Sequence, residues 1–242
     1  MILCIIQARM GSNRLPEKVL KPILGRPMLG RMLDRLKRAK LIDEIAIATS
    51  LTPADNAIEA FCESEDIRCF RGSEDNVLER FAGCAALFSN ADHIIRVTGD
   101  CPLIDPTLMD SFIESYLQLL PNIDHYHLGA PNYPRGLDAE IFPKNVLEIT
   151  AQNAINDYEL EHVTPYIYRN PDRFISKTFT SGEDHSDQRW CVDEEDDFKL
   201  VEAIFEMLHP TNPNFTWLDV LQLLDAQPEL KQINAHVLQK NT

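Results

Sequence analysis

The first hundred residues alternate between strand-like and helix-like segments, and this alternation limits the possible folds more than any other feature of the chain. Segments of strand length that are rich in apolar residues lie at residues 2–6, 44–48, 67–70 and 93–97. Amphipathic segments with apolar residues at helical spacing lie at residues 28–39, 52–64 and 76–88. A strand-helix order repeated in this way predicts an α/β fold, with a mostly parallel sheet between two layers of helices.

The size and composition of the chain indicate a protein with a substantial core. It has 242 residues, of which 44% are hydrophobic, so it can form one large domain or one domain with an appended lobe. No apolar stretch approaches the roughly 18 residues of a membrane span, and Met1 leads directly into a strand without a signal segment. Six cysteines lack any C-x-x-C pair, which is typical of reduced, mostly buried thiols. We therefore expect a soluble, cytoplasmic protein.

The charge of the chain is unevenly distributed. The net charge of −15 argues against nucleic acid or an anionic membrane surface as a partner. The first forty residues nevertheless hold ten basic and two acidic residues. We expect the cations between Arg26 and Lys40 to lie on the solvated face of a helix. Arg9 and Lys18 lie in the loop after the first strand, where open α/β sheets bind ligands, and they indicate a site for a polyphosphate.

A second loop follows the fourth strand and should meet the first at the same edge of the sheet. Gly99 allows close approach of the backbone, and Asp100 places a carboxylate beside the expected polyphosphate. Mg²⁺ prefers one or two carboxylates together with phosphate oxygens, so Asp100 is a candidate metal ligand. The alternative is that Asp100 only accepts hydrogen bonds from the backbone of a turn. Asp105, before Pro106, is expected to cap the next helix.

At this point the sequence resembles a known family. Residues 7–18, QARMGSNRLPEK, are similar to the A-R-x-x-S-x-R-[IL]-P-x-K signature of the cytidylyltransferases that activate acidic sugars. Residues 98–104, TGDCPLI, resemble the second motif of that superfamily. The spore coat polysaccharide biosynthesis protein F group is the most similar, because its pattern is also met, in order, at residues 71–81, 133–142, 161–166 and 189–198.

The resemblance implies both a fold and a reaction. The fold would be a Rossmann-like, glycosyltransferase-A-like three-layer sandwich. The reaction would transfer CMP from CTP to a sugar acid of the sialic, pseudaminic or legionaminic type, releasing pyrophosphate, in the biosynthesis of surface polysaccharide or glycan. Mg²⁺ would be the cofactor, and the protein would be a homodimer. The alternatives are a glycosyltransferase of the same fold that uses a nucleotide-sugar donor, and a non-catalytic nucleotide-binding subunit of a glycan pathway.

The family's functional positions can be transferred one by one to this sequence. The resemblance implies catalytic roles for Arg9, Lys18 and Asp100, and metal binding by Asp100 and Asp193. It implies nucleotide binding by Ala8, Arg9, Gly11, Ser12, Lys18, Arg71, Arg80 and Gly99. It implies sugar binding by Arg135, Asp138, Glu140 and His162. Arg135 would pair with the carboxylate of the substrate, and Asp138 and Glu140 would contact its hydroxyl groups.

Three of these positions have structural alternatives. Arg71 could instead bridge to Glu74 or Glu79. His162 could pack between Tyr158 and Tyr166 on a helix over residues 156–168. Asp193 could cap a helix over residues 196–209, although Glu194 or Asp196 could do so in its place.

The resemblance also predicts how the chain is organised: one domain that contains an insert, followed by an extension. Residues 1–210 are expected to form a single nucleotidyltransferase domain, within which residues 121–182 form an insert for sugar binding and dimerisation. Residues 211–242 are expected to form a short helical extension at the C-terminus.

His125 and His127 would share one face of a strand in the insert, but two histidines without further ligands favour zinc only weakly.

Overall fold

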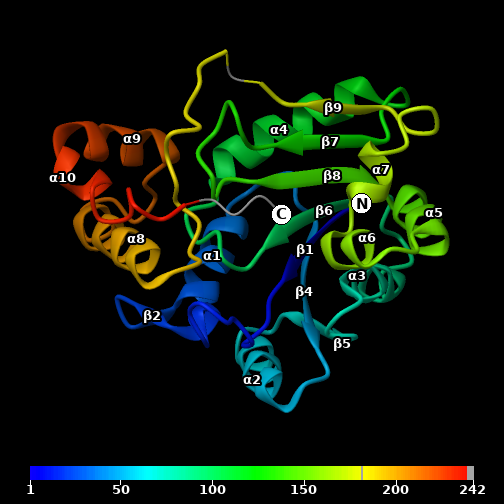
Figure 1. Cartoon of the computed structure of the whole chain (residues 1–242), viewed down its shortest axis with the longest axis horizontal. Coiled ribbons are helices and arrows are strands. Elements are labelled where there is room, and N and C mark those ends of the chain that lie inside the picture. Colours follow the sequence, from blue (N-terminus) through cyan, green and yellow to red (C-terminus); the bar gives the residue numbers. More distant parts are fainter. Residues whose placement is uncertain (181, 239–242) are drawn as a thin grey trace.

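The computed structural model describes residues 1–180 and 182–238, which form a seven-stranded central sheet with the strand order β5-β4-β1-β6-β8-β7-β9 (Figure 1). The parallel part consists of β5 (Arg68–Gly72), β4 (Glu44–Ser50), β1 (Ile2–Gln7) and β6 (His93–Thr98). β8 (Ala139–Pro143) runs antiparallel to β6 and to β7 (His125–Leu128), and β9 (Ser176–Thr178) runs parallel to β7. The four strands predicted from the alternation are therefore confirmed.

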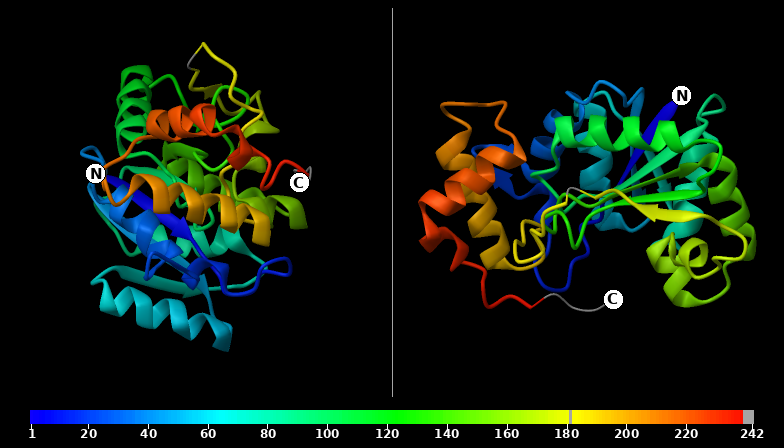
Figure 2. Two further views of the ribbon diagram at one scale, coloured as in Figure 1. Left: turned by 90° about the vertical axis from the view of Figure 1, so that its left-hand side faces the viewer. Right: turned by 90° about the horizontal axis from the view of Figure 1, so that it is seen from above.

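Helices cover both faces of the sheet, as Figure 2 shows from two further directions. The helices are α1 (Met28–Leu36), α2 (Asn56–Ser64), α3 (Val77–Ala86), α4 (Pro106–Leu119), α5 (Lys144–Asn153), α6 (Asp157–His162), α7 (Pro165–Tyr168), α8 (Glu195–Leu208), α9 (Trp217–Ala226) and α10 (Pro228–Lys231). Short 3₁₀ turns, η1 (Lys18–Leu20) and η2 (Pro53–Asp55), and the hairpin of β2 (Pro22–Ile23) and β3 (Arg26–Pro27) complete the elements.

The side chains of β1 show how the three layers are joined. Cys4 and Ile6 belong to the larger apolar core, together with residues of α1, α4, α8 and α9. Leu3 and Ile5 point to the other face and belong to a second core with α3 and α5. This alternation is the period of two that a strand imposes on its side chains. The predicted α/β three-layer sandwich, Rossmann-like and mostly parallel, is confirmed.

Two expectations about helices are wrong. The helix predicted over residues 156–168 is broken, because Val163 has a φ of 73° and Pro165, which has no N–H to donate, starts a separate turn of helix. The cations of α1 do not all face solvent. Arg35 is buried, and its guanidinium donates hydrogen bonds to the carbonyl oxygens of Ile104, at 2.7 Å, and Phe215, at 3.1 Å. Arg31 is buried as well.

The C-terminal helices pack on the same core as the parallel sheet. Phe215, Val220 and Leu224 are fully buried within the larger apolar core. Asp105 caps α4, as predicted, by accepting the N–H groups of Thr107 and Leu108. Its second oxygen accepts the N–H of Trp217 at 2.8 Å and so ties the start of α9 to the start of α4.

The predicted division of the chain remains a prediction. Residue 181, within the expected insert, and residues 239–242, within the expected extension, lie outside the described residues. Among the helices of the described residues, none combines the length and apolar character that crossing a membrane requires.

Candidate active site

The loops that follow β1 and β6 meet at the carboxyl edge of the parallel strands. The N–H of Gly99 donates to the carbonyl oxygen of Gln7 at 2.8 Å. A Cβ atom on Gly99 would lie 3.1 Å from that oxygen and 3.1 Å from the Cβ of Ala8. Glycine therefore allows the two loops to approach closely, as the sequence predicts.

A first cavity, of about 290 Å³, opens above this contact. Its lining includes these predicted site residues: Ala8, Arg9, Gly11, Ser12, Lys18, Arg80, Gly99, Asp100, His162 and Asp193. They come from five separate stretches of the chain, which the fold brings together at one edge of the sheet. The cations in the set give the cavity the chemistry that a polyphosphate requires.

Asp55 holds the loop after β1 in place, a role that the sequence did not reveal. One carboxylate oxygen accepts the N–H of Met10 at 2.7 Å, and the other accepts the N–H of Ser50 at 3.0 Å. Asp55 is fully buried. Burial alone would raise the pKa of this carboxyl group, but the hydrogen bonds to its ionised form hold the pKa below its usual range. The only signal in the sequence was an acid at a helix start, where a cap is the ordinary interpretation.

Lys18 lies at the centre of the charged groups. Its ammonium is 3.1 Å from Asp100 Oδ2 and 3.0 Å from Asp193 Oδ1, and it donates to the carbonyl oxygen of Val192 at 2.6 Å. The residue is only 8% exposed. Burial would lower the pKa of this ammonium, but the two carboxylates outweigh that effect and raise the pKa above its usual value. Lys18 is therefore a fixed positive charge near neutral pH.

Asp193 is surrounded by cations. In addition to Lys18, Arg14 lies 3.0 Å from Asp193 Oδ1, and Arg189 donates to Asp193 Oδ2 at 2.8 Å. Burial would raise the pKa of Asp193, whereas these cations lower it below its usual range. The alternative role as a helix cap does not hold, since Glu194 caps α8. The sequence did not reveal that Arg189 donates to Asp193, because this contact depends on how the chain turns between the two residues.

The two arginines expected near the nucleotide occupy different positions. Arg80 is buried, lines the first cavity and donates to the carbonyl oxygen of Ser73 at 2.7 Å. Its pKa is lowered by burial and by the nearby charge of Arg9. Arg71 is not brought to the first cavity. It donates to Glu59 at 2.7 Å and to the carbonyl oxygens of Ser50 and Thr52, and so braces the start of α2, without the expected bridge to Glu74 or Glu79.

A second cavity, of about 560 Å³, adjoins the first. The residues that line both are Gln7, Arg14, Thr98, Asp100, His162 and Asp193. Its other lining residues include the expected Arg135, Asp138 and Glu140, together with Arg96, His125, His127, Ser176 and Thr178 from β6, β7 and β9. The carboxylates of Asp100 and Asp193 therefore stand at the junction of the two cavities.

Glu140 organises one wall of the second cavity. It accepts hydrogen bonds from Arg96, at 2.6 Å, from His125 Nε2, at 3.0 Å, and from Thr164 Oγ1, at 2.7 Å. Although burial would raise the pKa of Glu140, Arg96 and His125 hold it well below its usual range. Since protein donors engage both oxygens of Glu140, the expected direct contact of Glu140 with substrate hydroxyls is not favoured by this geometry.

Two arginines that line the second cavity each have an unpartnered N–H group. Nε of Arg96 and Nε of Arg135 are both buried without a hydrogen-bond partner among the described residues. Unpartnered buried N–H groups of arginine are the groups that an anionic ligand would satisfy.

The case for zinc at His125 and His127 becomes weaker still, because His125 Nδ1 pairs with Ser176 at 2.8 Å while His125 Nε2 pairs with Glu140.

The loop that carries Arg135 is fixed against the segment before Asp193. Trp190 donates its N–H to the carbonyl oxygen of Arg135 at 2.6 Å. Gly136 has a φ of +105°, and a Cβ there would lie 2.5 Å from the backbone nitrogen of Cys191. Asp138 accepts the N–H of Gly136 at 2.7 Å and lies 3.3 Å from the guanidinium of Arg135, so it holds the loop in shape.

His162 lies where the two cavities meet. Its ring packs 4.5 Å from that of Tyr158, as expected, but the break after α6 removes Tyr166 from the same helix. Burial lowers the pKa of His162, which favours the neutral imidazole near pH 7. The imidazole can therefore accept a hydrogen bond or a proton at this junction.

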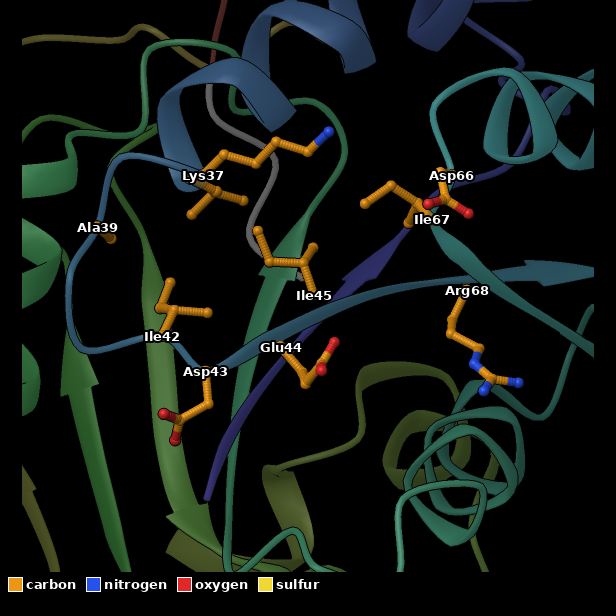
Figure 3. Close-up of a pocket in the computed structure, with 10 residues that line it drawn as sticks. Lys37, Ala39, Ile42, Asp43, Glu44, Ile45, Asp66, Ile67 and Arg68 are labelled. Atoms are coloured by element: carbon orange, nitrogen blue, oxygen red, sulfur yellow. The ribbon is translucent and has the colours of Figure 1, made fainter.

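A third cavity, of about 640 Å³, lies at the opposite edge of the sheet (Figure 3). It is lined by residues at the starts of β4 and β5 and at the end of α1, including Lys37, Glu44 and Arg68. None of the predicted site residues lines it. In open α/β sheets ligands bind outside the carboxyl ends of the strands, so this cavity is not the active-site candidate.

The pair of Asp100 and Asp193 fits a divalent cation. Oxygens of both carboxylates lie about 3 Å from one point, the ammonium of Lys18. No cluster of three or more histidine, cysteine or acidic side chains suited to a metal occurs within residues 1–180 and 182–238. Two carboxylates with the remaining positions open suit Mg²⁺, which retains waters and binds phosphate oxygens in nucleotide sites.

The fold and the site together define the class of the protein, a nucleotidyltransferase: the loops that hold Arg9, Lys18 and the acidic pair lie at the carboxyl edge of a parallel sheet. A family model described as Cytidylyltransferase matches residues 3–238. The chain belongs to this family, and it is a CTP-dependent nucleotidyltransferase. The predicted membership in the cytidylyltransferase superfamily is confirmed.

Relatives and solved structures agree with the family. The chain is 32% identical to the spore coat polysaccharide biosynthesis protein SpsF of Bacillus subtilis over 94% of its length and 95% of that protein. It is 35% identical to the 3-deoxy-manno-octulosonate cytidylyltransferase of Geobacter metallireducens, over 46% of its length and 43% of that protein. A solved cytidylyltransferase from Leptospira borgpetersenii superposes with a TM-score of 0.90 at 28% identity, covering 100% of this chain and 99% of the other.

Proposed function

We propose that the protein transfers CMP from CTP to a hydroxyl group of a sugar acid, of the sialic, pseudaminic or legionaminic type, and releases pyrophosphate. The product would be an activated sugar for surface polysaccharide or glycan. One observation carries the proposal: a cavity lined by Arg9 and Lys18 adjoins a cavity lined by Arg96 and Arg135, and Asp100 and Asp193 line the junction of the two. The alternative glycosyltransferase and the non-catalytic subunit are not favoured by the family.

The reaction assigns a role to each group of the first cavity. A hydroxyl oxygen of the sugar attacks the α-phosphorus of CTP, the bond from that phosphorus to the bridging oxygen breaks, and pyrophosphate leaves. Such transfers are accelerated mainly by positioning and by stabilising charge on the phosphate oxygens. Arg9 can bind two phosphate oxygens at once, Lys18 supplies a point charge, and the backbone at Gly11 offers an N–H group. The expected backbone contact at Ser12 is not favoured, because the N–H of Ser12 donates to the carbonyl oxygen of Met10 at 2.9 Å.

Mg²⁺ is the proposed cofactor, with Asp100 and Asp193 as the residues that would hold it. When bound, it would neutralise negative charge on the phosphate oxygens. Arg14 and Arg189, which contact Asp193, would fix the direction of that carboxylate. His162, at the junction of the cavities, is placed to receive the proton that the attacking hydroxyl loses.

The second cavity supports an anionic acceptor. Arg96 and Arg135 line it and each has a buried Nε–H without a partner among the described residues. The wall also offers the hydroxyl groups of Ser176 and Thr178 and the carboxylates of Asp100, Asp138, Glu140 and Asp193. A carboxylate would pair with an arginine, and the hydroxyl groups of a sugar would pair with those of Ser176 and Thr178. This arrangement supports a sugar acid rather than a neutral sugar.

We propose that the protein is located in the cytoplasm.

Residues 121–182 are the proposed dimer interface. Large apolar side chains of this segment are exposed, namely Ile155, Tyr168 and Ile175. Exposed apolar side chains are groups that a second copy of the chain would cover in a dimer.

A pair of matched acceptors tests the proposed substrate class. We expect a sugar acid to be turned over and its neutral carboxamide to be turned over poorly. Arg135→Ala should lower kcat/KM for the acid by about 10²-fold, the loss of one charged contact, and leave the value for the carboxamide nearly unchanged. Arg173→Ala, an exposed arginine of the same segment outside both cavities, is the control. Equal use of the acid and the carboxamide by the native enzyme would contradict the proposal.

A further inference from the structure

The ammonium of Lys18 occupies the point on which the two candidate metal ligands converge. It lies 3.1 Å from Asp100 Oδ2 and 3.0 Å from Asp193 Oδ1, and its third contact is the carbonyl oxygen of Val192, at 2.6 Å. These three partners are oxygen atoms, the ligand type that Mg²⁺ also prefers. An ammonium and a divalent cation cannot both occupy this point.

The surrounding charges oppose a second cation while Lys18 remains there. Asp193 already contacts Arg14 and Arg189 as well as Lys18, so one carboxylate faces three positive side chains. Asp100 has Lys18 as its ion-pair partner in the described part of the chain. The charge that Asp193 can offer to a metal is therefore largely compensated until a cation leaves or further negative charge arrives.

A triphosphate supplies that negative charge in the same cavity. Lys18 lines the first cavity together with Arg9, and its ammonium is at the end of a flexible four-carbon stem. The stem starts at η1, immediately after Glu17, which has a φ of 60°. The bonds of this stem can rotate, so the ammonium is not bound to one set of partners by its backbone position.

We propose that Lys18 is a resident substitute for the divalent cation: it holds the point between Asp100 and Asp193 in the nucleotide-free enzyme and leaves it when a nucleoside triphosphate binds. The metal then binds with or after the nucleotide, not before it. Lys18 thus couples occupation of the phosphate site to assembly of the metal site and keeps the two carboxylates from repelling each other in the resting enzyme. The inference rests on the proposed metal role of these carboxylates.

The affinity of the free protein for Mn²⁺, used in place of Mg²⁺ as a spectroscopic probe, tests this proposal. We expect native protein without nucleotide to bind Mn²⁺ weakly, as measured by electron paramagnetic resonance. Lys18→Met should bind one Mn²⁺ more tightly, by about 5- to 150-fold, the usual range for a coupling between two sites. Lys18→Arg retains the positive charge and should bind as weakly as the native protein.

Two further variants separate the proposed site from non-specific binding. Lys21→Met removes a nearby lysine whose ion pair with Glu195 is exposed, and it should bind Mn²⁺ as the native protein does. Adding Asp100→Asn to Lys18→Met should abolish the gain in affinity. If Lys18→Met is poorly folded, Mg²⁺ alone should raise its melting temperature and leave that of the native protein unchanged.

The proposal is overturned if Lys18→Met binds Mn²⁺ no more tightly than the native protein, or if Mg²⁺ fails to stabilise a poorly folded Lys18→Met. It is also overturned if the native protein without nucleotide already binds Mn²⁺ as tightly as the variant. No sugar acid and no CTP are present in these measurements. Their outcome is therefore distinguishable from a failure of the proposed acceptor class.

Discussion

Single residues of the site divide into those that bind ligand and those that hold the loops. We assign Arg9 to the first kind, because it is exposed and lines the first cavity. We expect Arg9→Ala to lower kcat/KM for CTP by about 10²- to 10³-fold, the usual effect of removing one group that stabilises transition-state charge. The melting temperature should not change. Arg68→Ala, an exposed arginine at the opposite edge of the sheet, is the control, and an equal loss of activity in both variants would contradict the assignment.

Asp55 belongs to the second kind and should show its effect in stability. Asp55→Asn keeps the shape of the side chain but puts an amide group where an oxygen accepts the N–H of Met10 or Ser50. We expect a loss of about 3 kcal/mol in the free energy of unfolding at pH 7, as for hydrogen bonds to a charged group. Urea denaturation measures this loss, with the exposed Asp172→Asn as the control.

The pH dependence of this loss follows from the direction of the pKa shift. Because the folded state lowers the pKa of Asp55, its carboxylate contributes its full stability above the unfolded pKa of about 4. That contribution is lost as the pH falls through the lowered pKa of the folded state. The difference between native protein and Asp55→Asn should therefore shrink in acid, and a difference that grows on acidification would contradict this role.

Residues that act close to a strand end could be predicted from the sequence, and residues that act through distant partners could not. Gly99 and Asp100 follow β6 directly, and the pattern that predicts the strand also places them at the site. Asp55 contacts Met10, 45 positions away, and the contact depends on how α2 packs on the sheet. Arg96 does have a signal in the sequence, since it is an arginine inside an otherwise apolar strand.

At the scale of elements, the loop between β7 and β8 is joined to the segment before α8 by the backbone at Gly136. We expect Gly136→Ala to destabilise the protein by more than about 1 kcal/mol and to lower turnover of the sugar acid, since a Cβ would push the loop away from Cys191. Gly25→Ala is a matched control, because Gly25 also has a positive φ, +74°, but no atom within 4 Å of the added Cβ. Equal losses in both variants, measured by thermal unfolding, would show that backbone strain alone is responsible.

The regular alternation of strand-like and helix-like segments made the parallel strands predictable. This alternation ends after residue 120, so the strands beyond that residue could not be predicted in the same way. The antiparallel β8, its neighbour β7 and the edge strand β9 come from a segment in which polar and apolar residues are mixed. Those polar residues face the second cavity and satisfy one another, as Glu140 does with Arg96 and His125. A strand whose face is a binding site does not show the apolar pattern of a buried strand.

For the whole molecule, one sheet edge unites groups from most of the length of the chain. Arg9 and Lys18 come from the first loop, Asp100 from the centre, and Asp193 from a segment that packs beside the C-terminal helices. Asp105 and Arg35 connect those helices to the sheet. The family match over residues 3–238 agrees with this integration of the C-terminal segment.

The central claim is that this assembly transfers CMP from CTP to a sugar acid, and product analysis tests it most directly. Purified protein with Mg²⁺ is incubated with CTP, ATP, GTP or UTP and with a panel of sugar acids and neutral sugars, while pyrophosphate release is measured and the product is identified by mass spectrometry. We predict pyrophosphate only with CTP and a sugar acid, matched by an equal amount of the CMP-sugar. Absence of pyrophosphate with every acid, together with sugar transfer from a nucleotide-sugar donor, would contradict the account.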